Sequence, residues 1–287
     1  MPLLRVIILA IVQGLAELLP VSSSAHVIVA EKLMGMDPST PAMTLLLVML
    51  HTGTMFAVIV YFWQRWKRAF FQNSGESWKF ISALIWATVL TGVVGYGIIK
   101  GIEETVFRNQ PHAWVEQLFD RLDLIAPALA AAGILILIAG LLEGRKYQKD
   151  APSREISTKQ ALLIGAVQGL CLPFRGFSRS GATISTGMLD GVPRMQAEDF
   201  SFALAVLITP AAVGRELLRL LETMHTGAGA LHSAIVPSLV GTVFAFLAGL
   251  LALKWLSRWL ENGKWYLFGV YCLVAAAAVE LLFLRGF

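Results

Sequence analysis

Long apolar runs separated by short charged loops dominate the chain. A helix that crosses the roughly 30 Å hydrocarbon core of a bilayer needs about 20 mostly apolar residues. Five segments meet this requirement: 42–62, 80–99, 124–142, 235–256 and 265–284. A sixth, residues 200–221, is interrupted by Pro210, Gly214 and Arg215 but is also expected to cross once. The pattern predicts an all-α integral membrane protein.

Two shorter apolar runs end abruptly at polar patches. Residues 3–19 stop at Pro20 and a serine run, and residues 161–172 stop at Pro173 and Gly176. Each patch is followed by further apolar sequence. A stretch that enters the bilayer but is too short to cross it is typical of a re-entrant hairpin, so we expect one hairpin in each half of the chain.

Composition and charge agree with a membrane protein. The 287 residues are 56% hydrophobic and only 15% charged, which excludes an ordinary soluble domain. The net charge of +4 comes from loops after residues 62, 142 and 256, whereas residues 100–123 are acid-rich. Basic loops are typical of the cytoplasmic side, so this charge indicates orientation and no nucleic-acid partner is expected.

This orientation predicts an inverted-topology repeat. Residues 1–41 must dip into the membrane and return to the outer face, and residues 160–195 must dip in and return to the inner face. Each half is then one re-entrant helical hairpin plus three transmembrane helices. We expect a single membrane domain over 1–287, with repeats at about 1–142 and 160–287 and a cytoplasmic loop at about 143–159.

A short sequence repeat supports the same division. Residues 10–15 read Ala-Ile-Val-Gln-Gly-Leu, and residues 165–170 read Gly-Ala-Val-Gln-Gly-Leu. A proline follows each copy, and then Ser-Ser-Ser-Ala at 22–25 and Ser-Arg-Ser-Gly at 178–181. The repeated block therefore precedes a serine patch in both halves.

The two patches contain the polar residues expected of a binding site. Hairpins that enter from opposite faces meet near the midplane, where irregular backbone survives only around a cavity or inside protein. Residues 17–26 and 173–183 supply Glu17, His26, Arg175 and Arg179 besides many hydroxyl groups. Helix N-termini near the serines and an arginine fork favour an anion. We therefore predict a phosphate pocket within reach of lipid.

Simpler roles are open for these residues taken singly. The serines at 22–24 can cap a helix, and Glu17 can form a structural pair with Arg179. Arg175 can extend to lipid head groups. The His-Thr-Gly-Thr sequence at 51–54 can be a helix-packing patch or can line the pocket. The joint occurrence of both patches favours a functional site.

These motifs resemble a known family. QxxxE at 13–17, PxSSSxH at 20–26 and GFSRSGAT at 176–183 are similar to the motifs of the bacterial undecaprenyl-diphosphate phosphatase (bacitracin-resistance) family. The resemblance extends over essentially the whole chain. It implies hydrolysis of undecaprenyl diphosphate to undecaprenyl phosphate and inorganic phosphate, which recycles the lipid carrier of cell-wall synthesis and confers bacitracin resistance. It also implies a homodimer in the bacterial inner membrane, a site open to the periplasm, and a divalent cation, Mg or Ca.

The resemblance also assigns roles to residues. Ser23 matches the nucleophile, and His26 matches the group that activates it or protonates the leaving group. Glu17 matches the second acid of the QxxxE motif and a metal ligand, and Arg179 matches the phosphate-binding arginine. Supporting contacts to the substrate are expected from Gln13, Ser22, Ser24, Arg175, Ser178, Ser180 and Thr183.

The sequence departs from the family motifs at two places, and alternatives stay open for the mechanism and for the function. Gln13 occupies a position that can be Glu in the family, so a two-carboxylate metal site is not available. Residues 173–178 insert length after the family's proline, which leaves the shape of that tip open. Covalent attack by Ser23 competes with direct attack by water. A transporter of a lipid phosphate or small anion is the rival function, because broken helices at the midplane are typical of transporters.

Overall fold

The computed structural model describes residues 2–38, 40–71, 74–108, 118, 121–143, 156–223 and 228–286. Over these residues the chain forms ten helices and no strand. They are α1 (Leu3–Leu18), α2 (Ser23–Leu33), α3 (Pro41–Phe71), α4 (Ser74–Val106), α5 (Leu122–Glu143), α6 (Thr158–Cys171), α7 (Arg179–Leu189), α8 (Arg194–Thr223), α9 (Ala228–Glu261) and α10 (Tyr266–Leu284). Two short helices followed by three long ones occur twice along the chain.

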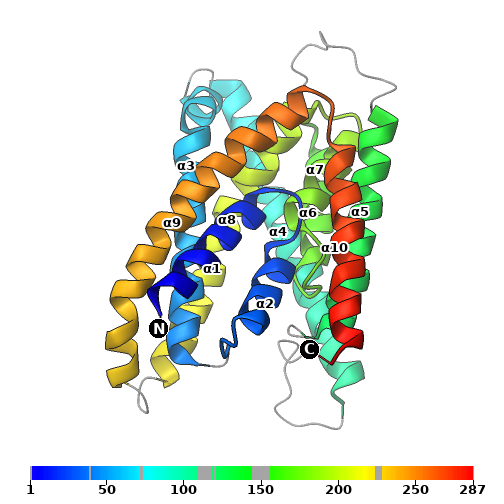
Figure 1. Ribbon diagram of the computed structural model, residues 1–287. Coiled ribbons are helices and arrows are strands. Elements are labelled where there is room, and N and C mark those ends of the chain that lie inside the picture. The colour runs from blue at the N-terminus through cyan, green and yellow to red at the C-terminus, as the bar shows by residue number, and fades with distance from the viewer. Residues whose placement is uncertain are drawn as a thin grey trace.

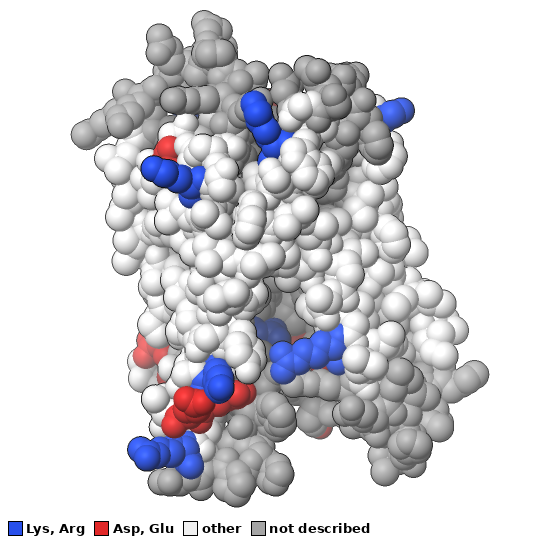
Figure 2. All heavy atoms as spheres, turned by 180° about the vertical axis from the view of Figure 1, so that it is seen from behind, with Lys and Arg blue, Asp and Glu red and all other residues white. Residues whose placement is uncertain are grey.

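The long helices confirm the predicted all-α membrane protein. Six of them, α3, α4, α5, α8, α9 and α10, are long and apolar enough to cross a bilayer. Each predicted crossing segment falls in one of these helices. On the face seen in Figure 2, the described Lys, Arg, Asp and Glu residues gather above and below an uncharged band. The chain is therefore a multi-pass membrane protein.

The short helices form the two helix pairs expected from the broken runs. α1 ends at Leu18 and α2 begins at Ser23, whereas α6 ends at Cys171 and α7 begins at Arg179. α1 packs against α9, and α6 packs against α4 (Figure 1). That the two halves lie in opposite orientations in the bilayer stays a prediction, as do the repeat boundaries, and most of the 143–159 loop lies outside the described residues.

The repeated Gln-Gly-Leu sequence has a packing role. A Cβ atom at Gly14 would lie 2.6 Å from the Ala245 carbonyl oxygen on α9. A Cβ atom at Gly169 would lie 2.7 Å from the Thr91 carbonyl oxygen on α4. The short helices can approach their long neighbours this closely because the contact positions carry no side chain. The repeat therefore places both hairpins deep against long helices.

Aromatic packing supports one wall of the region between the hairpins. Phe62 of α3 is fully buried and stacks on Phe202 of α8, with ring centroids 5.3 Å apart. Phe62 also stacks on Trp66, one turn further along α3, at 5.4 Å. This contact fixes the spacing of α3 and α8, which both line the pocket described next.

Candidate active site at the hairpin tips

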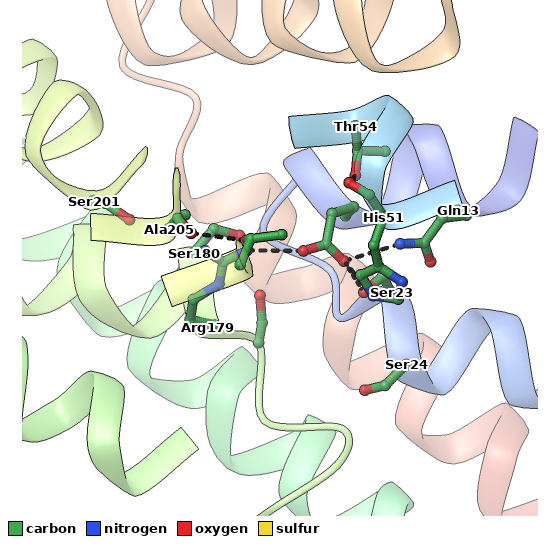
Figure 3. A network of polar contacts seen from close by, with 12 residues as sticks. Gln13, Ser23, Ser24, His51, Thr54, Arg179, Ser180, Ser201 and Ala205 are labelled. Carbon is green, nitrogen blue, oxygen red and sulfur yellow. Dashed lines mark hydrogen bonds and ion pairs between the residues drawn. The ribbon is translucent and has the colours of Figure 1, made fainter. Parts of the chain in front are cut away.

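Glu17, in the last turn of α1, lies at the centre of a polar network. Figure 3 shows its partners Gln13, Ser23 and Arg179. Its Oε2 atom accepts hydrogen bonds from Ser23 Oγ at 2.5 Å and from Gln13 Nε2 at 3.2 Å. Its Oε1 atom lies 2.8 Å from Arg179 Nη2. Gln13 and Glu17 reach each other because residues four apart share one face of a helix. Both carboxylate oxygens are thus held in place.

The first tip reverses sharply at Ser22. This residue has φ +67°, the one positive φ among the described non-glycine residues. Such a backbone conformation is rare and is held by its surroundings. The reversal starts α2 at Ser23 and turns its hydroxyl back onto Glu17, six residues earlier. Ser22 and Ser24 hydroxyls lie 3.2 Å apart at the same turn.

The second tip is built around a glycine and a helix cap. Gly176 has φ +98°, and a Cβ atom there would lie 2.5 Å from the Ile125 carbonyl oxygen, so the turn requires glycine. Ser178 caps α7 by accepting a hydrogen bond from the Gly181 N–H at 3.2 Å. Arg179 is the first residue of α7, and its side chain therefore starts at the positive end of this helix.

The two tips contact each other directly. The Gly176 N–H donates to Ser24 Oγ at 3.2 Å, and Ser180 Oγ lies 3.5 Å from the Leu19 carbonyl oxygen. The Arg179–Glu17 ion pair joins the same two tips. The serine patches of the two halves, about 150 residues apart in the sequence, therefore form one site.

A pocket opens beside this network between α1, α3, α7 and α8. Glu17 and Arg179 form its charged part, and His51 and Thr54 of α3 add polar groups. The other walls are largely apolar, with Leu18, Met55, Val58, Phe202, Ala205, Val206 and Thr209. A charged end next to apolar walls suits a ligand with an anionic head and a hydrocarbon chain.

Comparison with known proteins identifies the family. The family described as bacitracin resistance protein BacA matches residues 6–278. The chain belongs to the BacA family. Undecaprenyl-diphosphatase 2 of Acinetobacter baylyi is 56% identical, with 98% of both chains covered. The undecaprenyl-diphosphatases of Halothermothrix orenii and Rhodopirellula baltica are each 32% identical, covering 98% and 99% of this chain.

The ring nitrogens of His26 in this BacA chain contact Ser22 and Tyr271. Its Nδ1 lies 2.8 Å from the Ser22 carbonyl oxygen, and its Nε2 lies 2.7 Å from the Tyr271 hydroxyl of α10. The two rings are stacked, with centroids 5.6 Å apart and an interplanar angle of 13°. Both ring nitrogens are thus engaged, and the activation of Ser23 by His26 stays a prediction.

The remaining residues predicted to bind substrate differ in their burial and contacts. Thr183 is buried, and its hydroxyl lies 2.6 Å from Ser201 Oγ of α8, so it joins α7 to α8. Ser178 and Ser180 are also buried. The Arg175 side chain is exposed at the second tip. The structure thus brings Gln13, Ser23 and Arg179 to Glu17, whereas Thr183 and Ser178 support the helices that carry them.

Two neighbours of the site complete its surroundings. The sequence left His51 open between helix packing and pocket lining; it lines the pocket, with Nε2 3.8 Å from Glu17 Oε2. Tyr271, which was assigned no role from the sequence, contacts His26. A histidine inside an apolar span is unusual and is itself a signal of function. Tyr271 had no such signal, because tyrosine is common at membrane interfaces and its contact depends on how α10 packs.

Possible metal ligands are few. Across the described residues, no group of three or more His, Cys, Asp and Glu side chains could hold a metal ion. Glu17 supplies the one carboxylate among the residues that line the pocket. Gln13 is buried and turns its amide NH2 group, not its oxygen, towards Glu17. Glu17 is therefore the one protein group here that fits Mg²⁺ or Ca²⁺, ions for which substrate phosphates can complete the coordination.

Proposed function

We propose that this chain is an undecaprenyl-diphosphatase, a hydrolase that converts undecaprenyl diphosphate to undecaprenyl phosphate and inorganic phosphate. The observation that carries the proposal is that Glu17 and Arg179 form an ion pair at a pocket in a membrane protein, with Ser23 hydrogen-bonded to Glu17. Relatives that share the full length of the chain bear this name. Undecaprenyl phosphate is the lipid carrier of cell-wall synthesis, so this reaction would recycle the carrier. A larger supply of the carrier would confer bacitracin resistance.

Arg179 and the tip backbone bind the terminal phosphate in this proposal. A guanidinium group has five N–H donors, and the ion pair with Glu17 engages the Nη2 nitrogen. The start of α7 adds a positive dipole end to the same place. Fixed donors of this kind stabilise the charge that develops during phosphoryl transfer. The prenyl chain would follow the apolar wall formed by α3 and α8.

Ser23 is the nucleophile in this mechanism. Its oxygen forms a bond to the terminal phosphorus while its proton passes to Glu17 Oε2, to which it is already hydrogen-bonded at 2.5 Å. The bond between that phosphorus and the bridging oxygen breaks, and its electron pair leaves with undecaprenyl phosphate. Water then hydrolyses the phosphoserine. Direct attack by water held at Glu17 is the competing route.

His26 supports the first tip in this scheme. Its contacts with Ser22 and Tyr271 hold the turn from which Ser23 projects. A divalent cation held by Glu17 together with the diphosphate would neutralise substrate charge. The same proposal includes a homodimer in the bacterial inner membrane with the site open to the periplasm, as the family resemblance implies.

The test is a hydrolysis assay on purified protein in detergent. Wild-type protein is expected to release inorganic phosphate from a long-chain prenyl diphosphate. A transporter would release none, because detergent leaves no second compartment for it to serve. Repeating the assay with a chelator tests whether a divalent cation is required. Activity that is unchanged by the chelator would contradict this requirement. Absence of phosphate release by the wild-type protein would contradict the proposal that it is a diphosphatase.

A further inference from the structure

His51 has one ring nitrogen directed at the site. The side chain projects from α3, and its Nδ1 lies 2.8 Å from the Leu47 carbonyl oxygen. A carbonyl oxygen can only accept, so Nδ1 carries the proton in the neutral ring and Nε2 is the basic nitrogen. Nε2 is the atom that lies 3.8 Å from Glu17 Oε2. The tautomer thus presents a proton acceptor to the pocket.

The gap between His51 and Glu17 has the size of a shared water site. A separation of 3.8 Å is too long for a direct hydrogen bond. One oxygen atom can nevertheless lie about 2.8 Å from both groups, which is an ordinary hydrogen-bond length. The His51 side chain is 39% exposed, and both residues line the same pocket. A water at this position would share Glu17 Oε2 with the Ser23 hydroxyl.

The two-step mechanism has a place for a second base. Glu17 receives the proton of Ser23 in the first step and can return it to Ser23 Oγ when the phosphoserine breaks down. In that sequence of proton transfers, another group accepts the proton of the attacking water. His26 is not placed for this task, since its two nitrogens contact Ser22 and Tyr271.

We propose that His51 is a catalytic residue that deprotonates the water in the second step, an inference that rests on the proposed function. The water oxygen bonds to phosphorus as one of its protons moves to His51 Nε2. The bond from phosphorus to Ser23 Oγ breaks, and Oγ takes the proton held by Glu17. Inorganic phosphate leaves, and His51 returns its extra proton to solvent.

The charges facing His51 are consistent with this role. Glu17 of α1 and Arg179 of α7 are the charged residues among those that line the pocket. α9 packs on α3 and has no ionisable residue between positions 238 and 253.

The charged residues of α8 lie away from His51 along the helices. Glu198 and Asp199 pair with Arg65, which is fourteen positions along α3 from His51. Arg215 and Glu216 lie on α8 beyond the pocket-lining Thr209.

The test separates the two chemical steps in a His51→Gln variant. Purified protein in detergent is mixed with farnesyl diphosphate labelled in its terminal phosphate, and the reaction is quenched at short times. Prenyl phosphate is expected to form in the first turnover at the wild-type rate, while the label accumulates on the protein. Steady-state turnover should fall by about 10²–10⁴-fold, as for loss of a general base. Thr52→Val is the matched control, because the Thr52 hydroxyl bonds to Val48 of its own helix.

A rescue experiment gives an independent readout. In His51→Ala, added imidazole should restore release of the label, which a purely structural role would not allow. Normal turnover in His51→Gln would overturn the inference, and so would a slow variant in which no label accumulates. Inactive wild-type protein would instead contradict the proposed function.

Discussion

Glu17 holds the site together at the scale of residues. One carboxylate oxygen accepts from Ser23 and Gln13, and the other pairs with Arg179. The same group therefore orients the proposed nucleophile and the proposed phosphate-binding residue. A partly buried carboxylate in this position needs its partners, because an unpaired charge inside the membrane is costly. The structural pairing with Arg179 and the chemical role of Glu17 are thus compatible.

Arg179 provides the sharpest test of phosphate binding. Arg179→Lys should lower kcat/KM by about tenfold to hundredfold, since a hydrogen bond to a charged group contributes about 1.5–3 kcal/mol and lysine lacks the planar fork. The measurement is steady-state hydrolysis of a prenyl diphosphate in detergent. Arg258→Lys is the matched control, because this arginine is exposed at the end of α9. Normal kinetics in Arg179→Lys would exclude the guanidinium clamp.

The sequence predicted some site contacts and missed others for a physical reason. Ser23, Glu17 and Arg179 could be grouped because they follow two copies of one repeated block. The direction of His26 could not be predicted, since it depends on where α10 places Tyr271. The contact of His51 depends likewise on the rotation of α3 against α1. Such contacts between distant helices are not encoded in local spacing.

Close helix contacts position the hairpins at the scale of elements. The predicted crossing segments were found, but several helices extend beyond them: α3 continues to Phe71 and α8 begins at Arg194. Apolarity marks only the part of a helix in the hydrocarbon, whereas the helix itself continues into the polar region. The breaks after α1 and α6 were predictable, because a proline follows each helix.

Gly14 tests the contact between α1 and α9. Gly14→Ala places a Cβ atom 2.6 Å from the Ala245 carbonyl oxygen, and the backbone must shift to accommodate it. We expect the free energy of unfolding to fall by about 1–3 kcal/mol, as for other overpacked cores. Thermal unfolding in detergent measures this change. Gly97→Ala on α4 is the control, because its Cβ would meet nothing within 4 Å. Equal thermal midpoints for the two variants would refute the close-contact role.

At the scale of the whole molecule, the charges of the loops predict the orientation in the bilayer. The charge pattern predicts that the 100–123 region is outside and that the loop between α9 and α10 is inside. Arrangement of the helices alone does not define the sides of a membrane. The described cysteines, Cys171 and Cys272, are buried, so an introduced exposed cysteine can report its side without interference.

Two single-cysteine variants test this topology. Glu104→Cys and Asn262→Cys both replace exposed residues. A membrane-impermeant maleimide added to intact cells should label Glu104→Cys at once and Asn262→Cys only after the membrane is permeabilised. The reverse pattern, or equal labelling of both variants in intact cells, would contradict the predicted orientation.

The central claim is that the two hairpin tips form one phosphoryl-transfer site with Ser23 as nucleophile. The most direct measurement is phosphate release by Ser23→Ala in detergent, compared with Ser82→Ala, whose hydroxyl bonds to the Lys79 carbonyl of its own helix. The account predicts that Ser23→Ala keeps its thermal stability within about 1 kcal/mol but loses turnover, whereas Ser82→Ala retains both. Full activity in Ser23→Ala would contradict the account.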